Sequence, residues 1–347
     1  METKVIQIRD IEKQKDDIEE AAELIRQGQV VAFPTETVYG LGADGLNETA
    51  VTQIYEAKGR PSDNPLILHV NSMAMVRELV TLIPEKAQTV MNRFWPGPLT
   101  VILPKSERVP KKTTGGLQSV AIRMPEHKLA LVLIEKAGVP IAAPSANTSG
   151  RPSPTRAEHV KEDLSGKIPM ILDGGKVFVG VESTIVDFTS EVPVILRPGH
   201  ISKKQLENVL GCEVLMNQGQ TDKVPKAPGM KYTHYAPKAN MILVLGDDNQ
   251  KVVDKINEET KKEHQEGRTV GIIATDENME FYHGDYVFSL GSRQNMDEVM
   301  LHLYGTIRQF DHTNVDVIYS EGFVGMEQEE AIMNRLIKSC GHEVIKV

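Results

Sequence analysis

The chain has 347 residues, of which 40% are hydrophobic and 25% charged, and its formal net charge is −9. This length favours two domains, the composition excludes wholesale disorder, and the acidic balance argues against a protein that coats nucleic acid. No apolar run is long enough to predict a membrane span, and the N-terminus lacks the apolar core of a signal peptide. The only two cysteines, Cys212 and Cys340, are far apart in the chain. We therefore expect a reduced, cytoplasmic protein.

Helix and strand signals alternate over residues 1–212. Apolar residues at helical spacing, with capping residues at the ends, predict helices over 18–28, 47–59, 73–80, 85–93, 128–138 and 201–211. Short apolar runs predict strands over 29–33, 65–70, 99–104, 119–124, 139–144, 169–174, 182–188 and 192–198. The alternation indicates an α/β domain with a mixed, twisted sheet.

A break follows at residues 213–238, which show no periodicity and contain three prolines. Connections of this length are usually functional or disordered. The alternation then resumes over 239–347. Strands are predicted at 241–246, 269–275, 285–290 and 315–320, and helices near 248–266, 297–310 and 327–340. These short apolar strands predict a smaller, Rossmann-like α/β domain with a largely parallel sheet.

A glycine-rich segment follows the first strand and contains a G-x-G-x-x-G pattern at Gly40, Gly42 and Gly45. We reject a dinucleotide site, because Lys58 and Arg60 stand where an acidic ribose ligand is expected. A turn that needs unusual backbone angles is the plainer interpretation. The preceding triplet 35–37 offers small hydroxyl groups on a loop at a strand end, where ligands often bind.

The second cluster combines two cations, a hydroxyl and an amide in the segment Lys58-Gly-Arg60-Pro-Ser62-Asp-Asn64. Such a constrained loop can direct donors at phosphate oxygens. Cations at a helix C-terminus also offset the helix dipole, and for Lys58 alone that interpretation is favoured. His69, on the following strand, fits a structural histidine at least as well as a ligand-binding one.

The remaining clusters lie at further strand ends. Arg123 stands in an apolar strand that begins at Ser119, so it needs an anion, either a substrate carboxylate or an internal partner. The loop 143–153 is rich in small polar residues and is either a ligand-facing loop or a simple turn. Ser183 and Arg197 stand at two further strand ends. No G-x-x-x-x-G-K-[ST] motif occurs, so a phosphate site here is not a P-loop.

Six motifs in order, PTETVYGLG, KGRPSDNPL, SVAIRMP, APSANTSG, ESTIVD and ILRPG, resemble the YrdC-type threonylcarbamoyl-AMP synthase family. The segment PGMKYTHYAP and the second α/β unit resemble its long, two-domain form. The resemblance implies a nucleotidyltransferase that joins L-threonine, bicarbonate or CO₂, and ATP, with Mg²⁺ on the triphosphate. It implies threonine binding by Thr37, His69, Arg123, Ala143 and Ser183. It implies ATP binding by Arg60, Ser62, Asn64, Ser119, Ser145, Asn147, Ser153, Arg197 and Tyr235.

Lys58 and Arg60 would carry catalysis by neutralising negative charge that develops on the phosphates. The product would pass to a separate complex that modifies transfer RNA. We expect the linker to act as a lid, with Tyr235 on the nucleotide.

Two alternatives lack catalysis. An RNA-binding module should show basic stripes and stacking aromatic residues, yet only 5% of residues are aromatic, so we expect no stable RNA binding. A regulatory nucleotide sensor would bind ATP without releasing pyrophosphate.

Overall fold

A computed structural model describes residues 1–217, 234–325 and 328–347. The chain divides into two compact units. Within the described residues the first unit comprises 1–149, 153–178 and 182–217, and the second comprises 150–152, 179–181, 234–325 and 328–347. Most of the expected lid, 213–238, falls outside the described residues. None of the helices described is both long enough and apolar enough to cross a membrane.

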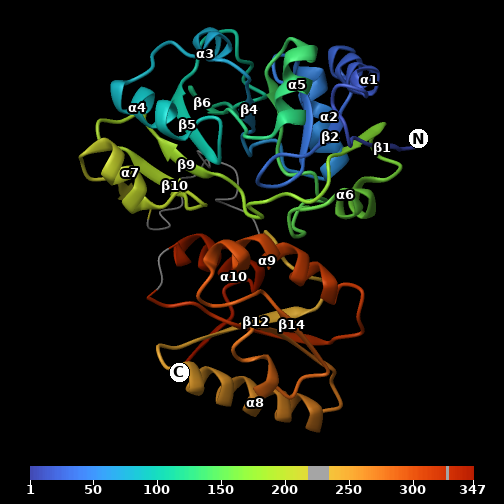
Figure 1. Cartoon of the computed structure of the whole chain (residues 1–347), viewed down its shortest axis with the longest axis vertical. Coiled ribbons are helices and arrows are strands. Elements are labelled where there is room, and N and C mark those ends of the chain that lie inside the picture. The colour runs from blue at the N-terminus through green and yellow to red at the C-terminus, as the bar shows by residue number, and fades with distance from the viewer. Residues whose placement is uncertain (218–233, 326–327) are drawn as a thin grey trace. The chain divides into compact units, whose positions relative to one another are not determined.

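The first unit is built on one large mixed sheet with helices packed on it (Figure 1). Among the described residues its strand order is β1-β8-β2-β3-β7-β4-β6-β5-β9-β10-β11. The strands are β1 (Lys4–Gln7), β2 (Val31–Phe33), β3 (Gly40–Asp44), β4 (Ile67–His69), β5 (Leu99–Pro104), β6 (Ser119–Arg123), β7 (Ile141–Ala142), β8 (Met170–Asp173), β9 (Thr184–Asp187), β10 (Val194–Arg197) and β11 (Leu215–Met216). The helices are α1 (Lys15–Arg26), α2 (Glu48–Lys58), α3 (Met73–Leu79), α4 (Glu85–Phe94), α5 (Lys128–Ala137), α6 (Ala157–Leu164) and α7 (Lys203–Leu210).

Local signals explain where α2 begins and ends. The Asn47 side chain accepts hydrogen bonds from the backbone N–H of Thr49 and Ala50, and Gly59 ends the helix with φ of 60°. Only glycine adopts that left-handed conformation at little cost, so the helix stops there. This ending places Lys58 in the last turn, at the entrance to the loop 59–65.

One apolar core joins α1 and α5 to the sheet. The two helices lie side by side (Figure 1), and their buried faces pack on β1, β2, β7 and β8. Ile18 and Ile25 of α1 and Leu133 of α5 are fully buried in this cluster. Burial of such side chains contributes about 1.5–3 kcal/mol each, so this layer anchors the sheet that carries the polar clusters.

The glycine-rich segment is a strand, which corrects its interpretation as a turn. Gly40 and Gly42 lie in β3, antiparallel to β2. A Cβ on Gly42 would stand 2.6 Å from both Ile141 and Phe33 side-chain atoms, so close packing requires glycine here. The structure also contains elements that the sequence does not predict, namely β1, β11, β16 and α6.

The consecutive strands β4, β6, β5, β9 and β10 carry His69, Ser119, Arg123 and Arg197 of the expected site residues, and Ser183 directly precedes β9. In the parallel pair β4–β6, His69 stands opposite Arg123. In the parallel pair β5–β9, Leu99 stands opposite Thr184, the residue after Ser183. Arg197 lies in β10 opposite Ile185 of β9. Pairing of neighbouring strands thus places residues as far apart in the chain as Leu99 and Thr184 opposite each other.

The second unit holds a parallel sheet of strand order β14-β13-β15-β12-β16 in the described residues. As Figure 1 shows, α8 lies on one face and α9 and α10 lie on the other, which confirms the predicted α/β organisation. The elements are β12 (Asn240–Leu245), α8 (Asn249–Gln265), β13 (Val270–Ala274), η1 (Met279–Phe281), β14 (Tyr286–Ser289), α9 (Met296–Phe310), β15 (Val317–Glu321), α10 (Glu329–Ser339) and β16 (Val344–Lys346).

Candidate functional site

Arg123 is the centre of a buried polar cluster in the first unit. Its side chain is 4% exposed, and its Nη1 donates to Thr37 Oγ1 at 2.8 Å while its Nε donates to Gly97 O at 3.3 Å. Its Nη2 lies 2.7 Å from Glu36 Oε1. The loop between β2 and β3 thus supplies a hydroxyl and a carboxylate to a cation on β6. The sequence allows either a substrate carboxylate or an internal anion as the partner of Arg123, and the structure supplies an internal one, Glu36. The planar guanidinium of Arg123 can also bind a carboxylate ligand.

His69 lies beside this cation and is held neutral. Burial, helped by the charge of Arg123, lowers the pKa of His69 to about 3. Its Nδ1 is buried without a hydrogen-bond partner. Directly after the neighbouring strand β7, Ala143 is buried and its N–H donates to Ile67 O at 3.0 Å. A neutral imidazole donates one hydrogen bond and accepts another, which suits a polar, uncharged ligand group.

Ser183 and Arg197 form a second polar cluster. Arg197 Nη2 donates to Ser183 O at 3.0 Å and lies 3.3 Å from Ser183 Oγ. Ser183 Oγ also lies 2.7 Å from Thr100 Oγ1. The expected threonine residue and the expected ATP residue are therefore in direct contact. In the same unit, Ser153 Oγ donates to Glu182 Oε1 at 2.5 Å.

Lys58 is buried, with 1% of its surface exposed. Its ammonium donates to Asn147 O at 2.5 Å and to Ser145 O, and it lies 3.4 Å from Asn147 Oδ1. These acceptors all belong to the loop after β7, so Lys58 joins the end of α2 to this loop. The sequence allows two roles for Lys58, offsetting the helix dipole or binding phosphate. The structure adds a third role, which is to fix the loop that carries the expected ATP ligands Ser145 and Asn147.

The other expected phosphate-side residues differ in exposure. Asn64 is 1% exposed, and its Oδ1 is buried without a hydrogen-bond partner. Arg60 is half-buried and donates to Pro65 O at 3.3 Å, whereas Ser62 is exposed. Ser119 is half-buried at the start of β6. The loop 59–65 therefore carries one half-buried cation and one buried amide.

Tyr235 belongs to the second unit. Its ring centroid lies 5.1 Å from that of Tyr304 and 5.5 Å from that of His234. Its φ of 68° falls in the left-handed region that residues other than glycine adopt rarely. The expected contact between Tyr235 and ATP stays a prediction.

Two residues of the cluster were given no role by the sequence. Glu36 is fully buried, and the signal that points to it is a carboxylate inside the segment 34–43, whose other residues are uncharged. Thr100 lies in an apolar strand and gave no signal. Within the residues described, no group of three or more His, Cys, Asp or Glu side chains could hold a metal ion.

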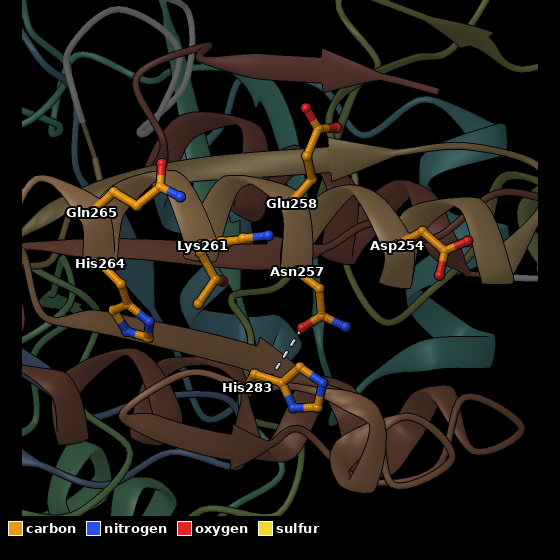
Figure 2. Close-up of a pocket in the computed structure, with 8 residues that line it drawn as sticks. Asp254, Asn257, Glu258, Lys261, His264, Gln265 and His283 are labelled. Carbon is orange, nitrogen blue, oxygen red and sulfur yellow. Dashed lines mark hydrogen bonds between the residues drawn. The ribbon is translucent and has the colours of Figure 1, made fainter.

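A surface depression in the second unit carries none of the expected residues. Figure 2 shows that residues of α8 and His283 line it. The His283 N–H donates to Asn257 Oδ1 at 3.2 Å, which ties the loop after η1 to the helix. The buried clusters of the first unit, with their pairing of cations, hydroxyls and a carboxylate, remain the better candidate for chemistry.

Comparisons with known proteins cover both units. A family model described as telomere recombination, Sua5/YciO/YrdC, matches residues 23–199, and the threonylcarbamoyl-AMP synthase C-terminal domain model matches 201–341. The chain is 50% identical to the threonylcarbamoyl-AMP synthase of Bacillus subtilis, over 95% of this chain and 94% of that one. It is equally identical to the synthase of Pyrococcus abyssi, over 99% of this chain and 100% of that one.

Two solved structures of P. abyssi Sua5 are also similar. One, complexed with L-threonine, is 49% identical with a TM-score of 0.93, covering 99% of this chain and 100% of that one. The other, a double-alanine variant at a His-Tyr pair, is 48% identical with a TM-score of 0.94, covering 99% and 98%.

Proposed function

This chain belongs to the threonylcarbamoyl-AMP synthase family, and from that premise we propose how its first unit carries out the reaction. The reaction is the ATP-dependent formation of L-threonylcarbamoyl-AMP with release of pyrophosphate, a nucleotidyl transfer. The substrates that we assign are L-threonine, bicarbonate or CO₂, and ATP. The product supplies threonylcarbamoyladenosine modification of transfer RNA.

The observation that carries the assignment is the buried contact between Arg123 and Thr37. A guanidinium beside small hydroxyl groups suits an amino acid that has both a carboxylate and a hydroxyl. His69, Ala143 and Ser183 complete the threonine side of the proposed site. A related Sua5 of P. abyssi has been crystallised with L-threonine, which supports this use of the cluster.

ATP binding is proposed for a further set of residues. The set comprises Arg60, Ser62, Asn64, Ser119, Ser145, Asn147, Ser153, Arg197 and Tyr235. The threonine amine first forms a carbamate, and a carbamate oxygen then attacks the α-phosphorus in line and expels pyrophosphate. Such transfers depend mainly on positioning and on stabilisation of charge. Arg60 supplies that charge, and Lys58 holds the loop of Ser145 and Asn147 in place.

Magnesium enters as part of the substrate. We propose that Mg²⁺ arrives on the ATP phosphates, because magnesium is usually held through substrate phosphates with few protein ligands. The chain's own contribution is the placement of Arg60 and Asn64 beside those phosphates.

A separate tRNA threonylcarbamoyl transferase complex is the partner that we propose for the product. The cytoplasm, where ATP and transfer RNA are available, is the location that we propose. The role of a lid for residues 213–238 remains part of this proposal, with closure excluding water from the carbamate.

The test is incorporation of ¹³C-bicarbonate by the full chain with ATP and L-threonine, followed by mass spectrometry of the adenylate. Label in the threonylcarbamoyl carbon supports the proposal. An unlabelled adenylate would overturn the assigned carbon source, and ATP binding with no adenylate would favour a nucleotide sensor instead.

A further inference from the structure

Glu36 is a fully buried carboxylate that lacks ordinary hydrogen-bond partners. It lies in the loop between β2 and β3, and neither Oε1 nor Oε2 accepts a hydrogen bond. Oε1 is 2.7 Å from Arg123 Nη2, yet that nitrogen is also left without a hydrogen bond, so the ion pair is poorly aligned. Buried charges are normally paired and fully hydrogen-bonded, so this arrangement needs an explanation.

A purely structural pair would align its atoms. Arg123 already has good partners on its other nitrogens, at Thr37 Oγ1 and Gly97 O. His127, the N-cap residue of α5, also feels the charge of Glu36. Burial lowers the pKa of His127, and the Glu36 carboxylate opposes that shift. The Glu36 carboxylate therefore lies beside a fixed cation and interacts electrostatically with a buried imidazole whose Nδ1 has no hydrogen-bond partner.

An amino-acid substrate is a zwitterion, so a buried site for it needs both charges. Arg123 meets the carboxylate in the proposed function, which leaves the substrate ammonium in need of an acceptor. We propose that Glu36 contacts the α-ammonium of L-threonine and takes its proton as the carbamate forms. This inference rests on the proposed function and adds a catalytic residue to it.

The proton step balances with bicarbonate as the carbon source. The threonine ammonium and bicarbonate give the carbamate, one water and one proton. The N–C bond forms as the C–OH bond of bicarbonate breaks, and the released proton goes to a carboxylate oxygen of Glu36. A carboxylate placed beside the reacting nitrogen can act as the general base without a further co-reactant.

The experiment compares two ligands in calorimetric titrations without ATP. One is L-threonine, and the other is 2,3-dihydroxybutanoate of matching configuration, in which a hydroxyl replaces the ammonium. Hydrogen bonds to charged groups imply that the wild-type chain prefers threonine by about 10- to 100-fold. Glu36→Gln keeps the shape of the side chain and removes its charge, so it should bring the two affinities within about threefold.

Asp187→Asn is the matched control. Asp187 is also a buried carboxylate of the first unit, but its Oδ1 accepts a hydrogen bond from the Thr189 backbone N–H. It should keep the wild-type preference. In turnover at saturating threonine, Glu36→Gln should be slower by about 100-fold or more, since a general base is lost.

Two results would overturn the inference. One is an unchanged preference in Glu36→Gln, whether or not both affinities fall equally. The other is equal affinities in the wild-type chain, which needs no variant to fold. If the wild-type chain still forms the adenylate in either of these cases, only this inference fails. A wild-type chain that forms no adenylate would instead sink the proposed function.

Discussion

Replacing Lys58 by methionine tests whether its buried ammonium fixes the loop after β7. The Lys58→Met side chain fills a similar volume but cannot donate to Ser145 O, Asn147 O or Asn147 Oδ1. A buried acceptor that loses its partner costs about 1–3 kcal/mol. Two short hydrogen bonds are lost, to Ser145 O and Asn147 O, and burial of the apolar methionine side chain offsets part of that cost. We therefore expect a net destabilisation of about 3 kcal/mol.

The assay is urea unfolding followed by circular dichroism, together with the KM for ATP. At a slope of about 2 kcal/mol per molar urea, the midpoint should fall by about 1.5 M. The KM should rise, because Ser145 and Asn147 lose their anchor. Lys136→Met is the control, since Lys136 pairs only at the surface with Glu19 at 2.8 Å, and its effect should stay within about 1 kcal/mol. A wild-type midpoint and KM in Lys58→Met would refute the reasoning.

Three further predictions concern single side chains. The pKa of His69 is lower in the folded state than in the unfolded state. The free energy of unfolding is therefore unaffected by the titration of this histidine above pH 6.5 and falls as the pH drops from 6.5 toward 3, because only the unfolded state takes up the proton. The free-energy advantage of wild type over His69→Gln should shrink by about 2 kcal/mol between pH 7 and 5 in urea titrations, and a constant difference would contradict this. Threonine should exceed valine by at least about 100-fold in kcat/KM for pyrophosphate release, and equal use of valine would be inconsistent with a hydroxyl-binding pocket. Tyr235→Ala should raise the KM for ATP and also lower the urea midpoint, because the buried ring packs on Tyr304. An unchanged KM would remove Tyr235 from the nucleotide site.

The fold was predictable where local signals are strong. Asn47 and Gly59 delimit α2 as the sequence indicates, because capping depends on neighbours only a few residues away. The prediction of a turn at 40–44 is wrong, because glycines also allow close strand packing. That need arises from Phe33 and Ile141, which the fold brings against the strand.

The site was only partly predictable for a similar reason. The sequence marks Arg123 as a costly buried cation, but its partners Thr37 and Glu36 lie more than 80 residues away and are set by strand order. Lys58 gave no sign of complete burial, because lysines are usually exposed and its oxygen partners are mostly backbone carbonyls that leave no trace in a sequence.

The most direct test of the central claim is pyrophosphate release by the full chain with ATP and bicarbonate, measured with and without L-threonine. The account predicts release that requires threonine and is matched by an equal amount of L-threonylcarbamoyl-AMP. Release at the same rate without threonine, or ATP binding with no release in either condition, would contradict it.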